Sequence, residues 1–103
     1  MRVDLDKYLE TGVVSEDVEV TGNYELRGLI KGNVTVKPGS KFNNNGTVAG
    51  SVRVEGGYCE INGTVEGEIH NLGGELMIAG TVGGEITGEA QIRDNAILYF
   101  ERD

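Results

Sequence analysis

Several residue types are scarce in this chain of 103 residues, and each scarcity excludes a class of protein. A single proline, with no Gly-X-Y period, excludes a collagen triple helix. A single cysteine excludes an intrachain disulfide. No apolar run approaches the roughly 20 residues that a membrane-spanning helix needs. Aromatic residues make up only 6% of the chain, and tryptophan is absent, so a wide globular core would be hard to fill.

Glycine is abundant instead, with 17 residues, and it is regularly spaced. Segments that begin at Gly46, Gly63 and Gly80 nearly superimpose, with the pattern Gly-Thr-Val-x-Gly-x-[Val/Ile] and starts 17 residues apart. Looser copies begin at Gly12 and Gly28. Self-similarity at a fixed short period is the signature of a repeat architecture.

Each copy reads as short strands, because its apolar residues are β-branched and alternate at a spacing of two. A period of 16–18 residues with about three straight pieces fits one coil of a three-sided β-solenoid. The sequence therefore predicts a single all-β domain of about five coils over residues 12–96. We expect residues 1–11 to form an N-terminal lead or cap and residues 97–103 to form a C-terminal cap, because an open coil exposes unpaired backbone groups.

Stacked coils should place similar residues at equivalent positions, and five such columns can be drawn. Two columns are apolar in all five copies: Val14, Ile30, Val48, Val65 and Val82; Val18, Val34, Val52, Ile69 and Ile86. Three columns are partly broken: Val20, Val36, Val54, Asn71 and Gly88; Tyr24, Phe42, Cys59 and Leu76; Leu26, Asn44, Ile61 and Ile78. The regularity of these columns supports the solenoid.

The repeats resemble those of the bactofilin family of bacterial cytoskeletal proteins, over about residues 12–97. The resemblance rests on the Gly-Thr-Val-x-Gly-x-[Val/Ile] copies and implies a right-handed, triangular β-helix that polymerises end to end without nucleotide. It also implies that apolar residues at the solenoid ends make the contacts, here Leu98, Tyr99 and Phe100. We expect Val14, Val18 and Val20 to serve at the other end if residues 1–11 move aside. The function implied is that of a non-enzymatic, self-assembling scaffold whose main partner is itself.

Catalytic and cofactor chemistry has few candidates. Cys59 falls on an inward column, which is typical of a small core residue, and His70 falls at an outward position with no evident partner. No glycine-rich stretch ends in the Gly-Lys-Ser/Thr of a phosphate-binding loop. We therefore expect no enzyme activity, no cofactor, no metal and no small-molecule substrate. An approximate hexapeptide spacing keeps a left-handed β-helix acyltransferase as an alternative, and the row of Thr47, Thr64 and Thr81 keeps an ice-binding surface as another.

Charge is the remaining signal, with a net of −8 that is unevenly distributed. Residues 1–19 carry a net of −4, residues 20–53 a net of +4, and residues 54–92 a net of −7 with seven Glu and no Lys or Arg. Such an acidic balance disfavours nucleic-acid binding. The main alternative function is a small acidic inhibitor or adaptor that meets a basic protein partner. Its acidic face would comprise Glu55, Glu66, Glu68 and Glu85.

The start of the chain bears on its location. It has neither the apolar stretch of a secretory signal nor the arginine-rich character of a transit peptide, so we expect a cytoplasmic protein. Asp4, Asp6 and Glu10 make this segment acidic, so membrane docking is not expected.

Overall fold

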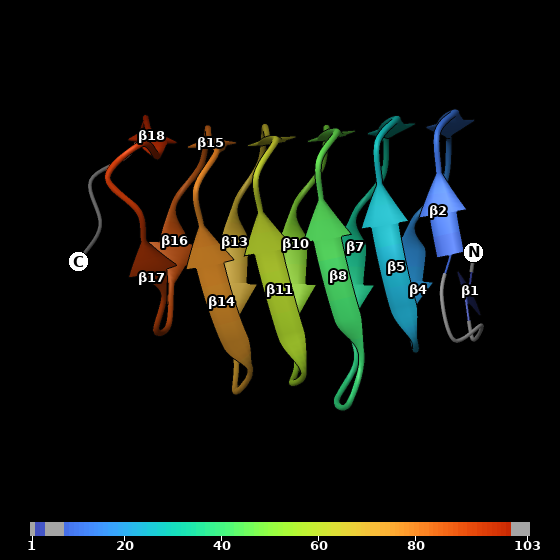
Figure 1. The fold of residues 1–103 in the computed structure, drawn as a ribbon, viewed down its shortest axis with the longest axis horizontal. Helices are drawn as coiled ribbons and strands as arrows, with labels where there is room; N and C mark the ends of the chain where they lie inside the picture. Colours follow the sequence, from blue (N-terminus) through green and yellow to red (C-terminus); the bar gives the residue numbers. More distant parts are fainter. Residues whose placement is uncertain (1, 4–7, 100–103) are drawn as a thin grey trace.

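A computed structural model describes residues 2–3 and 8–99 of the chain, with side chains from residue 9 to residue 99. Within these ranges the chain contains strands and no helix. The strands form three parallel sheets of six strands each, which wrap around a common axis as a three-sided β-solenoid (Figure 1). The longest dimension, 34 Å, runs along that axis. The predicted fold class is confirmed.

Each turn of the solenoid contributes one strand to each sheet, and we name the sheets A, B and C in chain order. Sheet A consists of β1 (Arg2–Val3), β4 (Val18–Val20), β7 (Val34–Val36), β10 (Val52–Val54), β13 (Ile69–Asn71) and β16 (Ile86–Thr87). Sheet B consists of β2 (Tyr8–Glu10), β5 (Asn23–Leu26), β8 (Lys41–Asn44), β11 (Tyr58–Ile61), β14 (Glu75–Ile78) and β17 (Gln91–Ile92). Sheet C consists of β3 (Val13–Val14), β6 (Leu29–Ile30), β9 (Thr47–Val48), β12 (Thr64–Val65), β15 (Thr81–Val82) and β18 (Ile97–Leu98).

The coil is right-handed. In Figure 1 the chain rises through sheet B in front, crosses at the top through sheet C, returns downward through sheet A behind, and advances from right to left. A right-handed crossover is the normal connection between parallel strands of one sheet, because strands twist to the right.

The predicted columns form the core. Val52 pairs in register with Val34 on one side and Ile69 on the other, and Val65 pairs with Val48 and Val82 in the same way. These six side chains are buried, because alternate residues of the strands point inward between the three sheets. The core is thus a narrow apolar column of stacked β-branched and aliphatic residues that runs the length of the rod.

Two of the breaks in the columns are buried asparagines whose polar atoms are satisfied. Asn44 accepts a hydrogen bond from Gly46 N at 2.9 Å and donates one to Thr64 O at 3.1 Å. The second, Asn71, is 8% exposed, and its side-chain amide and oxygen are hydrogen-bonded to Gly74. A buried amide is tolerated when its donors and acceptors are paired, so the columns continue through both positions.

The strands extend beyond the five repeats at both ends. β1 and β2 pair with β4 and β5, and β18 pairs with β15, so each adds a further strand to its sheet. The added strand β1 covers two residues that the sequence analysis expects at a contact between copies. Val18 and Val20 are 2% and 0% exposed and lie one layer inside the rod, because β1 covers β4. They are core residues here, and their expected role in an end contact, which requires residues 1–11 to move aside, stays a prediction.

Val14 differs from these two valines, because it belongs to β3, the first strand of sheet C. Its side chain is nevertheless only 8% exposed. At the N-terminal end, therefore, Val14 alone of the three valines lies on an outermost strand.

Candidate functional site at the C-terminal end

The last turn of the rod, β16 to β18, has an outer edge to which no other described strand pairs. The backbone N–H and C=O groups on such an edge form a template for another strand. Each of these three strands is only two residues long, so the turn that closes the described solenoid is shorter in strand content than the turns beneath it. Among the described turns, it has the fewest residues in strands.

Apolar side chains of the last turn are incompletely covered by the described part of the chain. Ala90, Ala96 and Leu98 are partly buried against the core, and Ile92 is 37% exposed. Leu98 pairs in register with Val82, so it continues a core column to the end of the rod. In the turns beneath, the residues of the same columns are fully buried: Ile30, Val48, Val65, Ile61 and Ile78.

The structure places two of the three residues predicted for this end. Leu98 lies in β18, and Tyr99 follows it, with its backbone N–H donating to Val82 O at 3.1 Å. The Tyr99 side chain is 72% exposed, and Ile97 on the outer side of β18 is also exposed. Phe100, the third predicted residue, lies outside the described residues.

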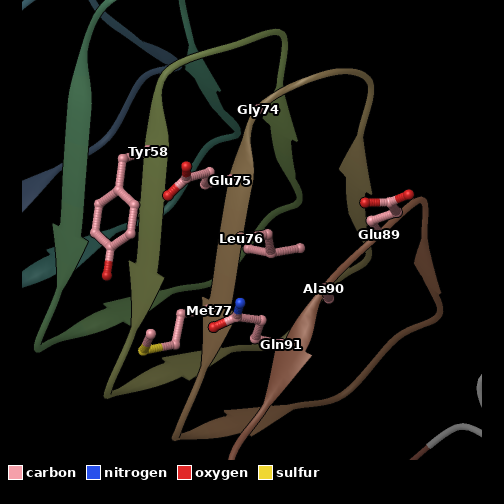
Figure 2. A pocket seen from close by; sticks show the side chains of 8 residues that line it. All are labelled: Tyr58, Gly74, Glu75, Leu76, Met77, Glu89, Ala90 and Gln91. Carbon is pink, nitrogen blue, oxygen red and sulfur yellow. The ribbon is translucent and has the colours of Figure 1, made fainter.

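A hollow of about 190 Å³ opens beside the last strand of sheet B. Figure 2 shows Leu76 and Ala90 together in this hollow, with Glu75 on one strand and Glu89 on the segment that leads to β17. The hollow exists because β17 pairs only with Met77 and Ile78, the second half of β14. Ala90 also has a much smaller side chain than Leu76, so the space above Leu76 is not filled.

Asn71 holds the turn that forms one wall of this hollow. Its side-chain amide donates to Gly74 O at 2.9 Å and to Glu89 O at 2.7 Å, and its side-chain oxygen accepts from Gly74 N at 2.9 Å. The next turn of the chain bends at Gly88, whose φ is +87°. Asn71, a polar residue in an otherwise apolar column, therefore holds the backbone at Gly74 on one side of the hollow and at Glu89 on the other.

The four predicted acidic residues do not share one face. Glu66, Glu68 and Glu85 lie in the connections between sheets C and A, whereas Glu55 lies between sheets A and B. Glu55 also accepts from Lys37 Nζ at 2.8 Å and contacts Arg53 Nε at 3.3 Å. The hydrogen bond from Lys37 lowers the pKa of the Glu55 carboxyl and raises the pKa of the Lys37 amine. Glu55 is thus engaged with basic residues of its own chain.

His70 has partners that the sequence did not reveal. Its Nε2 lies 3.0 Å from Glu68 Oε1 and its Nδ1 lies 2.8 Å from Thr87 Oγ1. Glu68 is two residues away, but Thr87 is one turn further along and becomes adjacent only through the pairing of β13 with β16. The 17-residue period could have predicted this neighbour, because His70 and Thr87 occupy equivalent positions.

The remaining site chemistry concerns Cys59 and metal ligands. Cys59 is fully buried in its column, and burial raises the pKa of its thiol. A buried thiol of raised pKa is chemically inert, because the thiolate is the reactive form. Within residues 9–99, no group of three or more His, Cys, Asp or Glu side chains converges as a metal site. The described part of the chain also contains no helix of the length and apolar character needed to cross a membrane.

Comparisons with family models, with curated proteins and with solved structures give no match to the chain.

Proposed function

We propose that this chain is a structural protein that assembles with copies of itself by stacking its solenoid ends, and that the C-terminal end is one contact surface. The proposal agrees with the resemblance of the repeats to bactofilins. Ile92, Ala96 and Leu98, with the open edges of β16 to β18, would form the contact. The resulting filament or short stack would act as a scaffold.

The observation that carries the proposal is a core that reaches the end of the rod without being fully covered by described residues. Ile92 is 37% exposed, whereas Ile78 in the strand beneath it is fully buried. Stacking another solenoid on this end would bury the apolar surface and pair the open strand edges at once. Apolar burial and strand pairing are also the interactions that hold successive turns together within one molecule.

Charge opposes this assembly at low ionic strength. Residues 54–92, which belong to the C-terminal turns of the rod, carry a net charge of −7, and residues 1–19 carry a net charge of −4. Contact between the ends of two copies therefore brings acidic segments together. Salt screens such repulsion, with a screening length of about 10 Å at 0.1 M ionic strength.

Light scattering coupled to size-exclusion chromatography tests the proposal across protein concentration and salt. We expect species larger than a monomer that grow with concentration and are favoured as salt rises from about 20 mM to about 500 mM, because repulsion between acidic ends is screened. A monomer at every concentration and salt would overturn the proposal. An acidic adaptor behaves in the opposite way, because its affinity for a basic partner falls as salt rises.

A further inference from the structure

Sheet C, at the top of Figure 1, has an outward row of side chains that carries no charge. Because strand residues alternate between the two faces, each strand of this sheet turns one side chain to solvent. The row consists of Val13, Leu29, Thr47, Thr64, Thr81 and Ile97, which pair in register from β3 to β18. Within residues 9–99, none of these side chains forms a hydrogen bond or an ion pair. A second surface can therefore cover this row without breaking a contact within the chain.

The outward faces of the other two sheets carry charged side chains that are held in ion pairs and hydrogen bonds. On sheet A, Arg53 Nε lies 3.3 Å from Glu55 Oε2. On sheet B, Tyr58 donates to Glu60 Oε1 at 2.9 Å. Covering such charged groups without new partners costs free energy, because they lose their contact with water. Sheet C is thus the side of the rod that a second surface covers at the least cost.

Apolar side chains are most exposed at the two ends of this row. Val13 in β3 is 61% exposed, Ile97 in β18 is 54% exposed, and Tyr99, which follows β18, is 72% exposed. These three are half of the six large apolar side chains that are exposed among the described residues. Exposed apolar residues that gather on one face mark a contact surface. Because both ends of the row are apolar, the row matches a copy of itself turned end for end.

One margin of sheet C carries a positive charge in its N-terminal half and a negative charge in its C-terminal half. Lys31 N donates to Val14 O and Glu66 N donates to Val48 O, each at 2.8 Å, so both residues continue the sheet C ladder. By strand alternation they face the same side as the uncharged row. Both are exposed, and neither side chain has an ion-pair or hydrogen-bond partner within residues 9–99.

We propose that two copies of this chain pair side by side through sheet C, with their axes antiparallel. A two-fold axis between β9 and β12 brings all six layers of the sheet into contact. It sets Val13 of each copy opposite Ile97 of the other and Thr47 opposite Thr64. The inference goes beyond the proposed function, because pairing uses a side of the rod and leaves both ends open for end-to-end assembly.

The charges select the antiparallel orientation. Residues 20–53 carry a net charge of +4 and residues 54–92 a net charge of −7, so opposite halves of the two copies lie side by side. A parallel pair would set like halves together. In the antiparallel pair, Lys31 of each copy lies one layer, about 4.8 Å along the rod, from Glu66 of the other. This contact occurs twice, on the same margin.

Sedimentation at a salt concentration of about 20 mM tests the pairing, because repulsion between acidic ends disfavours end-to-end assembly there. We expect the wild-type chain to form a dimer that grows no further. Thr64→Lys places a charge at the centre of the covered face, twice, so its dissociation constant should rise at least about 100-fold. Thr35→Lys is the matched control, because Thr35 is equally half-buried on the outer side of sheet A. Its effect should stay below about threefold. Equal effects in both variants would overturn the pairing through sheet C.

A charge exchange tests the orientation and does not touch the row itself. Lys31→Glu and Glu66→Lys should each weaken the dimer at least about fivefold, because each places like charges together at two sites. Weakening by Glu66→Lys would occur although this change lowers the net negative charge. The double variant restores opposite charges and should pair within about twofold of the wild-type chain. A double variant as weak as the single ones would overturn the antiparallel arrangement.

The outcomes separate side-by-side pairing from end-to-end assembly. If the wild-type chain is monomeric at about 20 mM salt up to about 1 mM protein but grows at high salt, the proposed function stands and the pairing is overturned. If it forms a dimer that does not grow at any salt concentration, the pairing stands and end-to-end assembly fails.

Discussion

Ile92→Lys is expected to abolish assembly while the solenoid stays folded. Ile92 is 37% exposed at the open end of sheet B, so a lysine there can reach solvent in the isolated chain. In a stack, the same position would be covered by the next copy, and an unpaired buried charge costs several kcal/mol. We expect the concentration needed for assembly to rise at least about 100-fold, as measured by light scattering, because each 1.4 kcal/mol is a factor of ten.

Leu72→Lys is the matched control. Leu72 is 58% exposed and lies in the connection between β13 and β14, on the side of the rod and not at its end. The change in charge and in side-chain size is comparable in the two variants. Assembly should survive in Leu72→Lys, and its circular dichroism and that of Ile92→Lys should match the wild-type spectrum. Equal loss of assembly in both variants would show that net charge matters and that the end surface does not.

Gly63→Ala is expected to destabilise the solenoid by about 3 kcal/mol or more, since overpacking against rigid backbone has no easy relief. Gly63 lies at the corner between sheets B and C, where successive turns approach closely. A Cβ atom at this position would lie 2.0 Å from Gly46 O and 3.0 Å from Asn45 C, so two turns of the backbone would have to separate. Urea denaturation followed by circular dichroism measures the loss.

Gly12→Ala provides the comparison at the equivalent position of the first repeat. The nearest atom to its added Cβ would be Glu10 Oε2 at 3.4 Å, which is an ordinary contact. We expect the free energy of unfolding to change by less than about 1 kcal/mol, the scale of a Gly-to-Ala change without strain. A similar large loss in both variants would mean that glycine is needed for backbone freedom and not for the close approach of turns.

The repeat made the fold predictable from the sequence. Because coil follows coil at a nearly constant period, one register assigns every column, and the structure confirms positions such as Val34, Val52 and Ile69. The apparent breaks at Asn44 and Asn71 also lie in the columns as predicted. Their hydrogen bonds could not be foreseen, because they depend on where the corner backbone of the next turn lies.

The candidate site was predicted less fully. Leu98 and Tyr99 could be located at the end because the apolar pattern stops there. The strand that covers Val18 and Val20 could not be predicted, because β1 lies outside the recognisable repeat and its pairing with β4 is a long-range contact. The hollow beside Ala90 was not predicted. A small residue indicates a hollow only when the residues that pair with it in the column are known.

Electron microscopy of assembled material, with measurement of the axial subunit repeat, tests the central claim most directly. If one solenoid stacks on the next and all copies point the same way, six layers per chain at a strand spacing of ~4.8 Å give a repeat of about 29 Å. A repeat of about twice that length would mean that alternate copies are inverted. Preparations that contain only single rods at high concentration and high salt would contradict the account.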